Sequence, residues 1–148
     1  MIPVVVLAVL FVAFSLAGRL GVPFIWGWWT SLRFALCGMF LLTASAHWGK
    51  RRPDLVRMVP PVFPKPALLV TLTGIIEILG ALGLLIPYTA RLAALGLCVL
   101  LFCLFPANVR AAREKLTIAG RPVPSLLPRA AIQVVFVAAT LAVVFGAD

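Results

Sequence analysis

The sequence predicts an all-α membrane protein, a bundle of five membrane-spanning helices in a single domain that covers residues 1–148. Composition supports this fold class, because 64% of the residues are hydrophobic and only 11% are charged. A soluble domain carries about 25% charged residues, and one of this length buries only roughly 70% of the surface that its unfolded chain exposes. The excess apolar surface must therefore face lipid. In addition, the apolar residues are grouped in five runs, each near the roughly 20 residues that a spanning helix needs.

The apolar runs predict helices at residues 2–18, 28–47, 67–86, 90–108 and 129–146. Two loops, 48–65 and 109–128, are basic and contain prolines. In the first of them, residues 54–58 are expected to form a short helix at the membrane surface. Pro61 to Pro64 fit the P-x-x-P pattern, which in a tight loop between helices indicates a rigid spacer rather than a recognition motif.

The first helix has to be distinguished from a signal peptide. Ser15-Leu16-Ala17 would fit a cleavage site. However, no basic segment precedes the apolar run, and the run is longer than a signal peptide requires. We therefore expect the first helix to be retained and to lie at the periphery of the bundle. The alternative is a signal peptide that is cleaved off.

The basic residues orient the predicted helices. Ten of them lie in or beside the two long loops and three lie on the opposite side. Because positive charge collects in cytoplasmic loops, we expect a multi-pass protein of the cell membrane with a cytoplasmic N-terminus and an external C-terminus. The basic residues that give the chain its net charge of +9 flank the apolar runs, and this placement argues against nucleic-acid binding. The expected partners are the lipid bilayer and either another membrane protein or a second copy of this chain.

The three cysteines, Cys37, Cys98 and Cys103, have no metal-ligand spacing, so no metal site is expected. Cys98 and Cys103 lie about 140° apart around one helix and cannot pair with each other. All three are interpreted as small packing residues, although Cys37 could meet Cys98 across two helices. The four tryptophans, at positions 26, 28, 29 and 48, lie at the two ends of the second helix. This placement is typical of aromatic belts, and an aromatic ligand cage is the alternative.

Glu77 is the most informative residue, because it lies halfway along an apolar helix and so near the bilayer midplane. An acidic residue there raises the free energy of membrane insertion by on the order of 3 kcal/mol. The aliphatic residues of the same helix lower it by about 4 to 7 kcal/mol in total, so the helix still inserts. Helical spacing places Glu77 on a face of small and partly polar residues, which allows another helix to approach. That face comprises Val70, Thr73, Gly74, Glu77, Gly80, Ala81 and Leu84. Glu77 is therefore expected to face the bundle interior, either as a functional group or as a neutral carboxyl that locks two helices together.

Gln133 and His47 are the first candidates to share a polar core with Glu77. Gln133 lies within about a turn of the same depth on the fifth helix, so it is the preferred partner. His47 shares a face of the second helix with Thr43 but lies near the cytoplasmic end, about 10 Å from Glu77 along the axis. Direct contact would need a bent helix or a water. His47 is interpreted either as an interfacial anchor or as a proton carrier.

Asn108, Arg129, Thr73 and Arg33 complete the candidate residues. Asn108 follows Phe105-Pro106, where the fourth helix is expected to end. With His47 and Arg129 it would line a polar vestibule, or it is simply the last residue of the helix. None of these residues completes a catalytic motif, so the sequence assigns neither catalytic residues nor an enzyme class.

Several motifs between Ser31 and Val135 together resemble the DoxX-like family of small membrane proteins. They are Arg33 at a helix start, Ala46-His47-Trp48, the Met58-Val59-Pro60 to Phe63-Pro64-Lys65-Pro66 loop, Thr73 to Pro87 around Glu77, Arg91-Leu92-Ala93-Ala94, Phe105-Pro106-Ala107-Asn108, and Arg129 with Gln133. The resemblance implies a four-helix core, which corresponds to the second to fifth helices here. Residues 2–18 are then an addition.

The resemblance also implies a function linked to membrane redox chemistry. Relatives are associated with thiosulfate:quinone oxidoreduction, thiol redox homeostasis, methylamine dehydrogenase maturation and receptor assembly. We expect a polar pocket around Glu77 that binds a quinone or another small amphipathic molecule, positioned by Gln133 and Asn108. The alternative is a non-catalytic accessory or assembly subunit. A dithiol mechanism is not carried over, because this sequence lacks a cysteine pair, and a transporter is least favoured in so short a chain.

Overall fold

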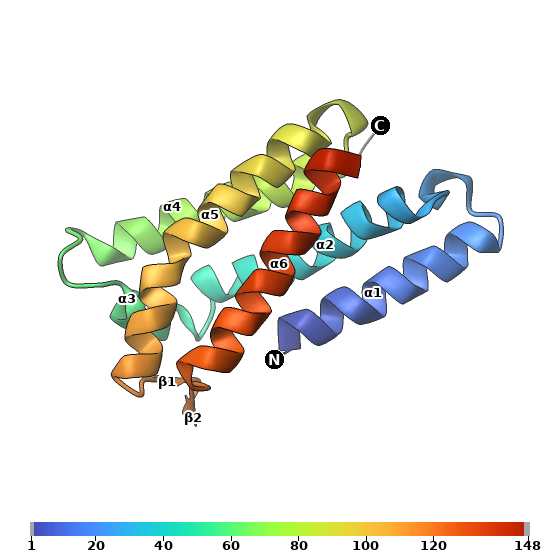
Figure 1. Ribbon diagram of the computed structural model, residues 1–148. Helices are drawn as coiled ribbons and strands as arrows, with labels where there is room; N and C mark the ends of the chain where they lie inside the picture. Colours follow the sequence, from blue (N-terminus) through green and yellow to red (C-terminus); the bar gives the residue numbers. More distant parts are fainter. Residues whose placement is uncertain (1, 147–148) are drawn as a thin grey trace.

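The computed structural model describes residues 2–146, and most of them lie in helices (Figure 1). The α-helices are α1 (Ile2–Arg19), α2 (Trp28–Ala44), α3 (Arg52–Met58), α4 (Pro66–Gly83), α5 (Pro87–Arg113) and α6 (Leu126–Gly146). Two 3-10 turns, η1 (Pro23–Ile25) and η2 (Ser45–His47), and two short strands, β1 (Thr117–Ile118) and β2 (Arg121–Pro122), complete the structure. Five helices are long and apolar enough to cross a membrane. Five long helices are thus present, as predicted, and α3 contains the short helix predicted at 54–58. The helix predicted at 28–47 changes to η2 after Ala44, and the helix predicted at 67–86 ends at Gly83.

Helix α2 lies at the centre of the arrangement, since it packs against α1, α4 and α6. Helix α5 packs against α4 and α6, whereas α1 contacts mainly α2 and lies at one side of the bundle (Figure 1). Glycines allow close approaches between these helices: Gly38 lies against Leu10 of α1, and Gly80 lies against Leu97 of α5.

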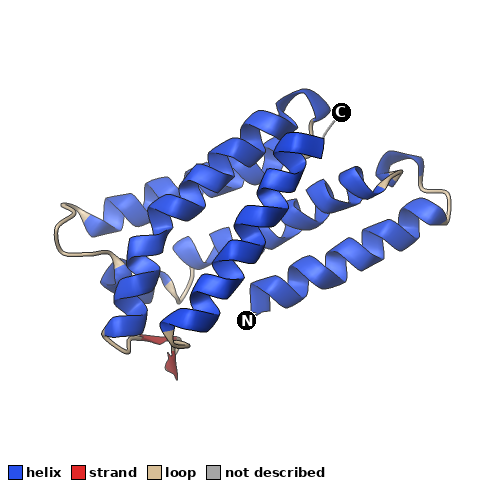
Figure 2. Cartoon of the chain, in the orientation of Figure 1, coloured by secondary structure: helices blue, strands red, loops and turns tan. Residues whose placement is uncertain are grey.

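The two basic loops meet at one end of the bundle, where Figure 2 shows the two strands in red below the helices and where β1 packs against α3. The Ala119 backbone N–H donates to Oδ2 of Asp54 at 2.8 Å, and Arg110 donates to the carbonyl of Val59. Strands β1 and β2 form an antiparallel hairpin that the sequence did not predict. Its two turn residues, Ala119 and Gly120, have φ angles of 51° and 74°, as a type I′ turn requires.

Helix α5 does not end at Asn108 as predicted but continues to Arg113. Pro106 lies inside the helix, where it removes one backbone hydrogen bond and bends the helix. Figure 1 shows this change of direction between the yellow and orange parts of α5. The residues beyond the bend are held by tertiary contacts, since Ala111 is completely buried. Asn108 is therefore an interior residue of the helix and not its last one.

Asp54 makes the contact between the two loops sensitive to pH. The Ala119 N–H and the Arg57 guanidinium lower the pKa of Asp54 below its ordinary value of 3.8. The ionised form therefore stabilises the folded loop above pH 3.8, and this contribution is lost as the pH falls through the lowered value. We expect the exchange protection of the Ala119 amide to fall on acidification, measured by hydrogen–deuterium exchange and corrected for intrinsic rates.

Two substitutions separate the charge of Asp54 from its role as an acceptor. Asp54→Asn should keep part of the protection and lose its pH dependence, whereas Asp54→Ala should remove the protection at every pH. Glu114→Gln is the control, because Glu114 pairs with Arg110 instead. Equal protection in the wild type and Asp54→Ala would disprove the contact.

Candidate functional site

Glu77 faces the interior of the bundle, as its helical spacing predicted. Its side chain is only 5% exposed, and the buried residues of α4 lie on the same face: Val70, Gly74, Glu77 and Ala81. The large aliphatic residues of α4 are exposed on the opposite side, with Leu79 at 63%. The sequence of α4 thus separates a surface suited to lipid from a surface that packs against α2 and α5.

The partner of Glu77 is Thr43 of α2, not Gln133. The Thr43 hydroxyl lies within hydrogen-bond distance of Oε1 of Glu77, and also 3.0 Å from the Phe40 carbonyl and 3.3 Å from the Met39 carbonyl. A hydroxyl has a single proton to donate. If Glu77 is neutral with its proton on Oε1, it donates to Thr43, which in turn donates to a carbonyl of its own helix. If Glu77 carries its proton on Oε2 or is ionised, Thr43 turns its own proton toward Oε1.

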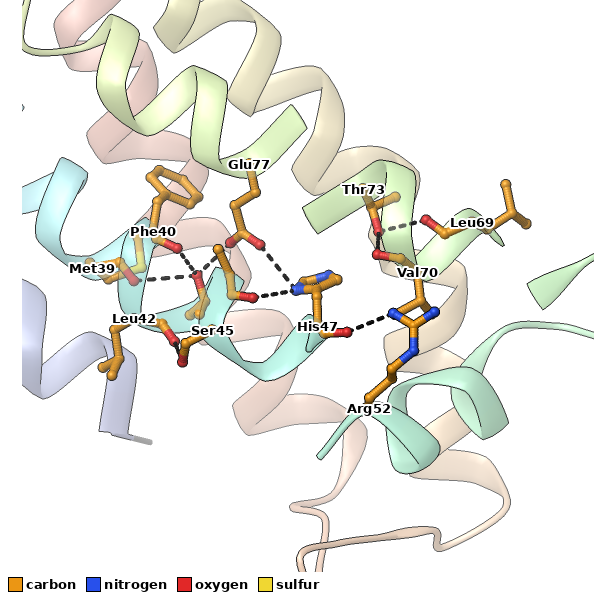
Figure 3. A network of polar contacts seen from close by, with 12 residues as sticks. Met39, Phe40, Leu42, Ser45, His47, Arg52, Leu69, Val70, Thr73 and Glu77 are labelled. Carbon is orange, nitrogen blue, oxygen red and sulfur yellow. Dashed lines mark hydrogen bonds and ion pairs between the residues drawn. The ribbon is translucent and has the colours of Figure 1, made fainter. Parts of the chain in front are cut away.

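His47 lies much closer to Glu77 than expected, with 3.7 Å between Nδ1 and Oε2 (Figure 3). The predicted separation of about 10 Å along the helix axis is wrong, because it placed His47 near the cytoplasmic end of the bundle. Instead α2 gives way to η2 beside the middle of α4, and the following residues run along the first turns of α4. Gly74 makes this approach possible, since a Cβ there would lie 2.8 Å from Cβ and Cγ of His47.

The imidazole of His47 has a defined orientation. Its Nδ1 lies 3.2 Å from the Ala44 carbonyl, which can only accept, so Nδ1 carries a hydrogen. Nδ1 thus lies 3.2 Å from the Ala44 carbonyl and 3.7 Å from Oε2 of Glu77. Oε2 is buried and has no hydrogen-bond partner within residues 2–146. The site therefore offers one unsatisfied carboxyl oxygen next to an N–H donor.

Arg52 fixes the segment that carries His47. Its Nη1 donates to the His47 carbonyl at 2.7 Å, and its Nη2 donates to the Ala67 carbonyl and to the Thr71 hydroxyl at 3.0 and 2.9 Å. Figure 3 shows Arg52 on the far side of His47 from Glu77. Neither Arg52 nor Thr43 was a predicted site residue. The signal for Thr43 was its position one turn before His47 on the same helix face.

Asn108, Gln133 and Arg129 form a separate polar cluster between α5 and α6. Asn108 Nδ2 donates to Oε1 of Gln133 at 3.3 Å, and Arg129 donates to Oδ1 of Asn108. Gln133 also donates to the Leu101 carbonyl, one residue before the carbonyl that Pro106 deprives of its helical partner. These three residues join α5 to α6 at the bend. The predicted vestibule brings Asn108 and Arg129 together, whereas the contacts of His47 are with α2, α4 and Arg52.

Arg33 and Thr73 also lie apart from the Glu77 carboxyl. Arg33 is buried and closes the end of α4, donating to the carbonyls of Leu84 at 2.7 Å and Leu85 at 3.0 Å. The Thr73 hydroxyl bonds to carbonyls of its own helix, at 2.9 Å to Leu69 and 3.1 Å to Val70. The predicted candidates thus fall into separate groups, and only His47 joins Glu77.

Within the described residues, no group of three or more His, Cys, Asp or Glu side chains could hold a metal ion. Cys37 and Cys98 are buried and free, and Cys103 is exposed. Two cavities, of about 580 Å³ and 240 Å³, lie between α1 and α2 and at the end of α2, and neither is lined by Glu77.

The fold and the site define a small helical protein with five helices that could span a membrane and a closed polar core between two of them. Residues 36–144 match the family described as Domain of unknown function (DUF8561), and the chain belongs to this family. The match runs from α2 to α6 and leaves α1 outside. No curated protein and no solved structure matches the chain.

Proposed function

We propose that this chain is an integral protein of the cell membrane with a DoxX-like four-helix core in α2, α4, α5 and α6. The length and apolarity of the helices support the membrane location. The contact between the two basic loops supports a common, cytoplasmic side for both. On this basis the N-terminus is cytoplasmic and the C-terminus is outside.

We further propose that Glu77 and His47 bind a small amphipathic carbonyl compound, of which a quinone is the leading example, in support of a membrane redox system. The observation that carries this proposal is the buried Oε2 of Glu77, which lacks a hydrogen-bond partner in the described part of the chain and lies 3.7 Å from Nδ1 of His47. A carboxyl group in this position donates a hydrogen bond to a carbonyl oxygen and transfers its proton when that oxygen becomes negative. Thr43 would donate its proton to Oε1 both before and after this transfer, which leaves Oε2 as the oxygen that donates to the ligand.

Trp48 provides a local probe for this binding. Its ring centroid lies 5.9 Å from that of His47, and quinones quench indole fluorescence at short range. We expect ubiquinone-1 to quench Trp48 saturably in protein purified in mild detergent. Glu77→Gln should weaken the binding about tenfold, because a hydrogen bond involving a charged or proton-donating group is replaced by a weaker one.

Two controls locate the effect. Trp48→Phe should remove the saturable part of the quenching, since the other tryptophans lie at the opposite end of α2. Gln133→Ala should leave ubiquinone-1 affinity unchanged, because Gln133 contacts α5 and not Glu77. If Glu77→Gln bound ubiquinone-1 as the wild type does, the proposed role of Glu77 would be wrong.

A second candidate function is that of an accessory or assembly subunit, in which Glu77 only joins α2 to α4. The separation of both described cavities from Glu77 favours this alternative. Affinity purification in mild detergent distinguishes the two functions. A stoichiometric membrane-protein partner without co-purified quinone supports the assembly role, whereas quinone in the lipid extract that is lost in Glu77→Gln supports ligand binding.

A further inference from the structure

A cavity of about 580 Å³ lies between α1 and the start of α2, at the end of the molecule away from the basic loops. Its volume is within the range of small-molecule sites, roughly 300 to 1,000 Å³. The lining comes from α1, from the segment before α2 and from the first turn of α2: Phe11, Ser15, Gly18, Arg19, Trp26, Gly27, Trp28 and Ser31. None of the groups proposed to act with Glu77 takes part in it.

The polar groups of this cavity favour a negatively charged ligand. Arg19 is its only charged lining residue and has no hydrogen-bond or ion-pair partner in the described part of the chain. Helix α2 begins here with Gly27 as its N-cap, and no side chain caps it. Its first N–H groups therefore lack helical partners and lie at the positive end of the helix dipole. The lining includes no carboxylate.

Ser15 supplies a second, independent indication of a ligand. Its hydroxyl oxygen is buried and has no hydrogen-bond partner within residues 2–146, and Ser15 is one of the residues that line the cavity. A buried hydroxyl without a hydrogen-bond partner destabilises the folded protein. The hydroxyl of Ser31, in contrast, has a hydrogen-bond partner, because it donates to the Gly27 carbonyl at 3.1 Å.

The order of residues along α1 indicates how a ligand would lie. Arg19, Ser15 and Phe11 follow one another at intervals of four residues and so share one helix face. Along this face the lining changes from a cation, through a hydroxyl, to an aromatic ring that packs edge-on against Trp28 at 5.4 Å. A molecule with an anionic headgroup and an apolar tail presents the matching sequence of groups.

We propose that this cavity binds the anionic headgroup of an amphiphile, with its phosphate at Arg19 and the start of α2 and its apolar tail along Phe11. The proposal rests on the membrane location given above but not on Glu77. It also assigns a role to α1, which lies outside the family match.

The three tryptophans beside the cavity allow a direct test. The protein, in a Trp48→Phe background, is reconstituted in phosphatidylcholine vesicles that contain either brominated phosphatidylglycerol or brominated phosphatidylcholine. Quenching by the anionic lipid should exceed that by the zwitterionic lipid about fivefold in apparent affinity, the effect expected of one cation close to a headgroup. Arg19→Gln should abolish this preference, and Ser15→Ala should reduce it. Arg91→Gln is the matched control, because Arg91 lies on the same predicted side but does not line the cavity.

Three outcomes would overturn the proposal. Equal quenching by both lipids in the wild type would exclude an anionic headgroup, provided that circular dichroism shows native helix content. Displacement of the brominated lipid by submillimolar inorganic phosphate would assign the cavity to a soluble anion instead. An intact mass that lacks residues up to Ala17 would show that α1 is removed as a signal peptide, which would eliminate the cavity and leave the proposed role of Glu77 unaffected.

Discussion

Replacing Arg33 with alanine is expected to lower the free energy of unfolding by about 3 kcal/mol. The last carbonyls of an α-helix have no partner within the helix. At the end of α4, the carbonyls of Leu84 and Leu85 are satisfied by the guanidinium of Arg33, which is itself buried. The substitution leaves these acceptors unpaired at a site where water has little access.

Two further variants distinguish the loss of these two hydrogen bonds from the effect of removing a positive charge. Arg33→Lys should be intermediate, because one ammonium group cannot reach both carbonyls with the geometry of a guanidinium. Arg113→Ala is the control, since Arg113 is exposed at the other end of α5. Unfolding is followed by tryptophan fluorescence in a fixed detergent. A stability of Arg33→Ala within about 0.5 kcal/mol of that of Arg113→Ala would contradict the capping role.

The orientation of Glu77 could be predicted from the sequence because it depends only on α4. The spacing of small and large residues within one helix determines which face is buried, and the long apolar runs determine where helices occur. Both predictions are confirmed by the burial of Val70, Gly74 and Ala81 beside Glu77. The length of α5 was not predicted, because contacts from other segments hold the residues after Pro106 in the helix.

The partners of Glu77 could not be predicted, because equal depth does not identify neighbouring helices. Gln133 belongs to α6, which packs on α5 and α2, whereas α4 packs on α2 and α5. Similarly, the separation of His47 and Glu77 along the membrane normal depends on the offset between α2 and α4. Gly74 allows that offset, because the absence of a side chain leaves space for His47 beside α4. A glycine in an apolar run does not indicate, however, which segment will fill the space. The DoxX-like resemblance and the quinone remain predictions that the fold alone does not test.

Gly74→Ala is the second substitution with a large expected effect, and it changes the site without removing a polar group. The added Cβ would lie 2.7 Å from the Trp48 ring and 2.8 Å from Cβ and Cγ of His47. The tip of the Trp48 ring can move aside, but Cβ of His47 is attached to the backbone of η2, which has to shift. Such overpacking costs about 1 to 3 kcal/mol, partly offset by the higher helix propensity of alanine, about 1 kcal/mol.

A glycine in open space provides the matched control for this substitution. Gly96 has no atoms within 4 Å of the position where a Cβ would lie, so Gly96→Ala should be neutral or stabilising by up to about 1 kcal/mol. We therefore expect Gly74→Ala to melt below the wild type and Gly96→Ala at or above it. Trp48 emission should change only in the first variant. Equal melting temperatures for both variants would show that the contact between η2 and α4 is not tightly packed.

The Gly74 and Glu77 variants together separate the two proposed functions of Glu77. If ligand binding needs His47 beside the carboxyl group, Gly74→Ala should weaken ubiquinone-1 binding, and combining it with Glu77→Gln should add little, because both changes disable one unit. If Glu77 only joins two helices, the losses of stability in the two single variants should be coupled, while ubiquinone-1 quenching stays non-saturable in all of them. The coupling between Gly74 and Glu77 in binding, rather than in stability, is thus the measurement that assigns the buried carboxyl group to a ligand or to the fold.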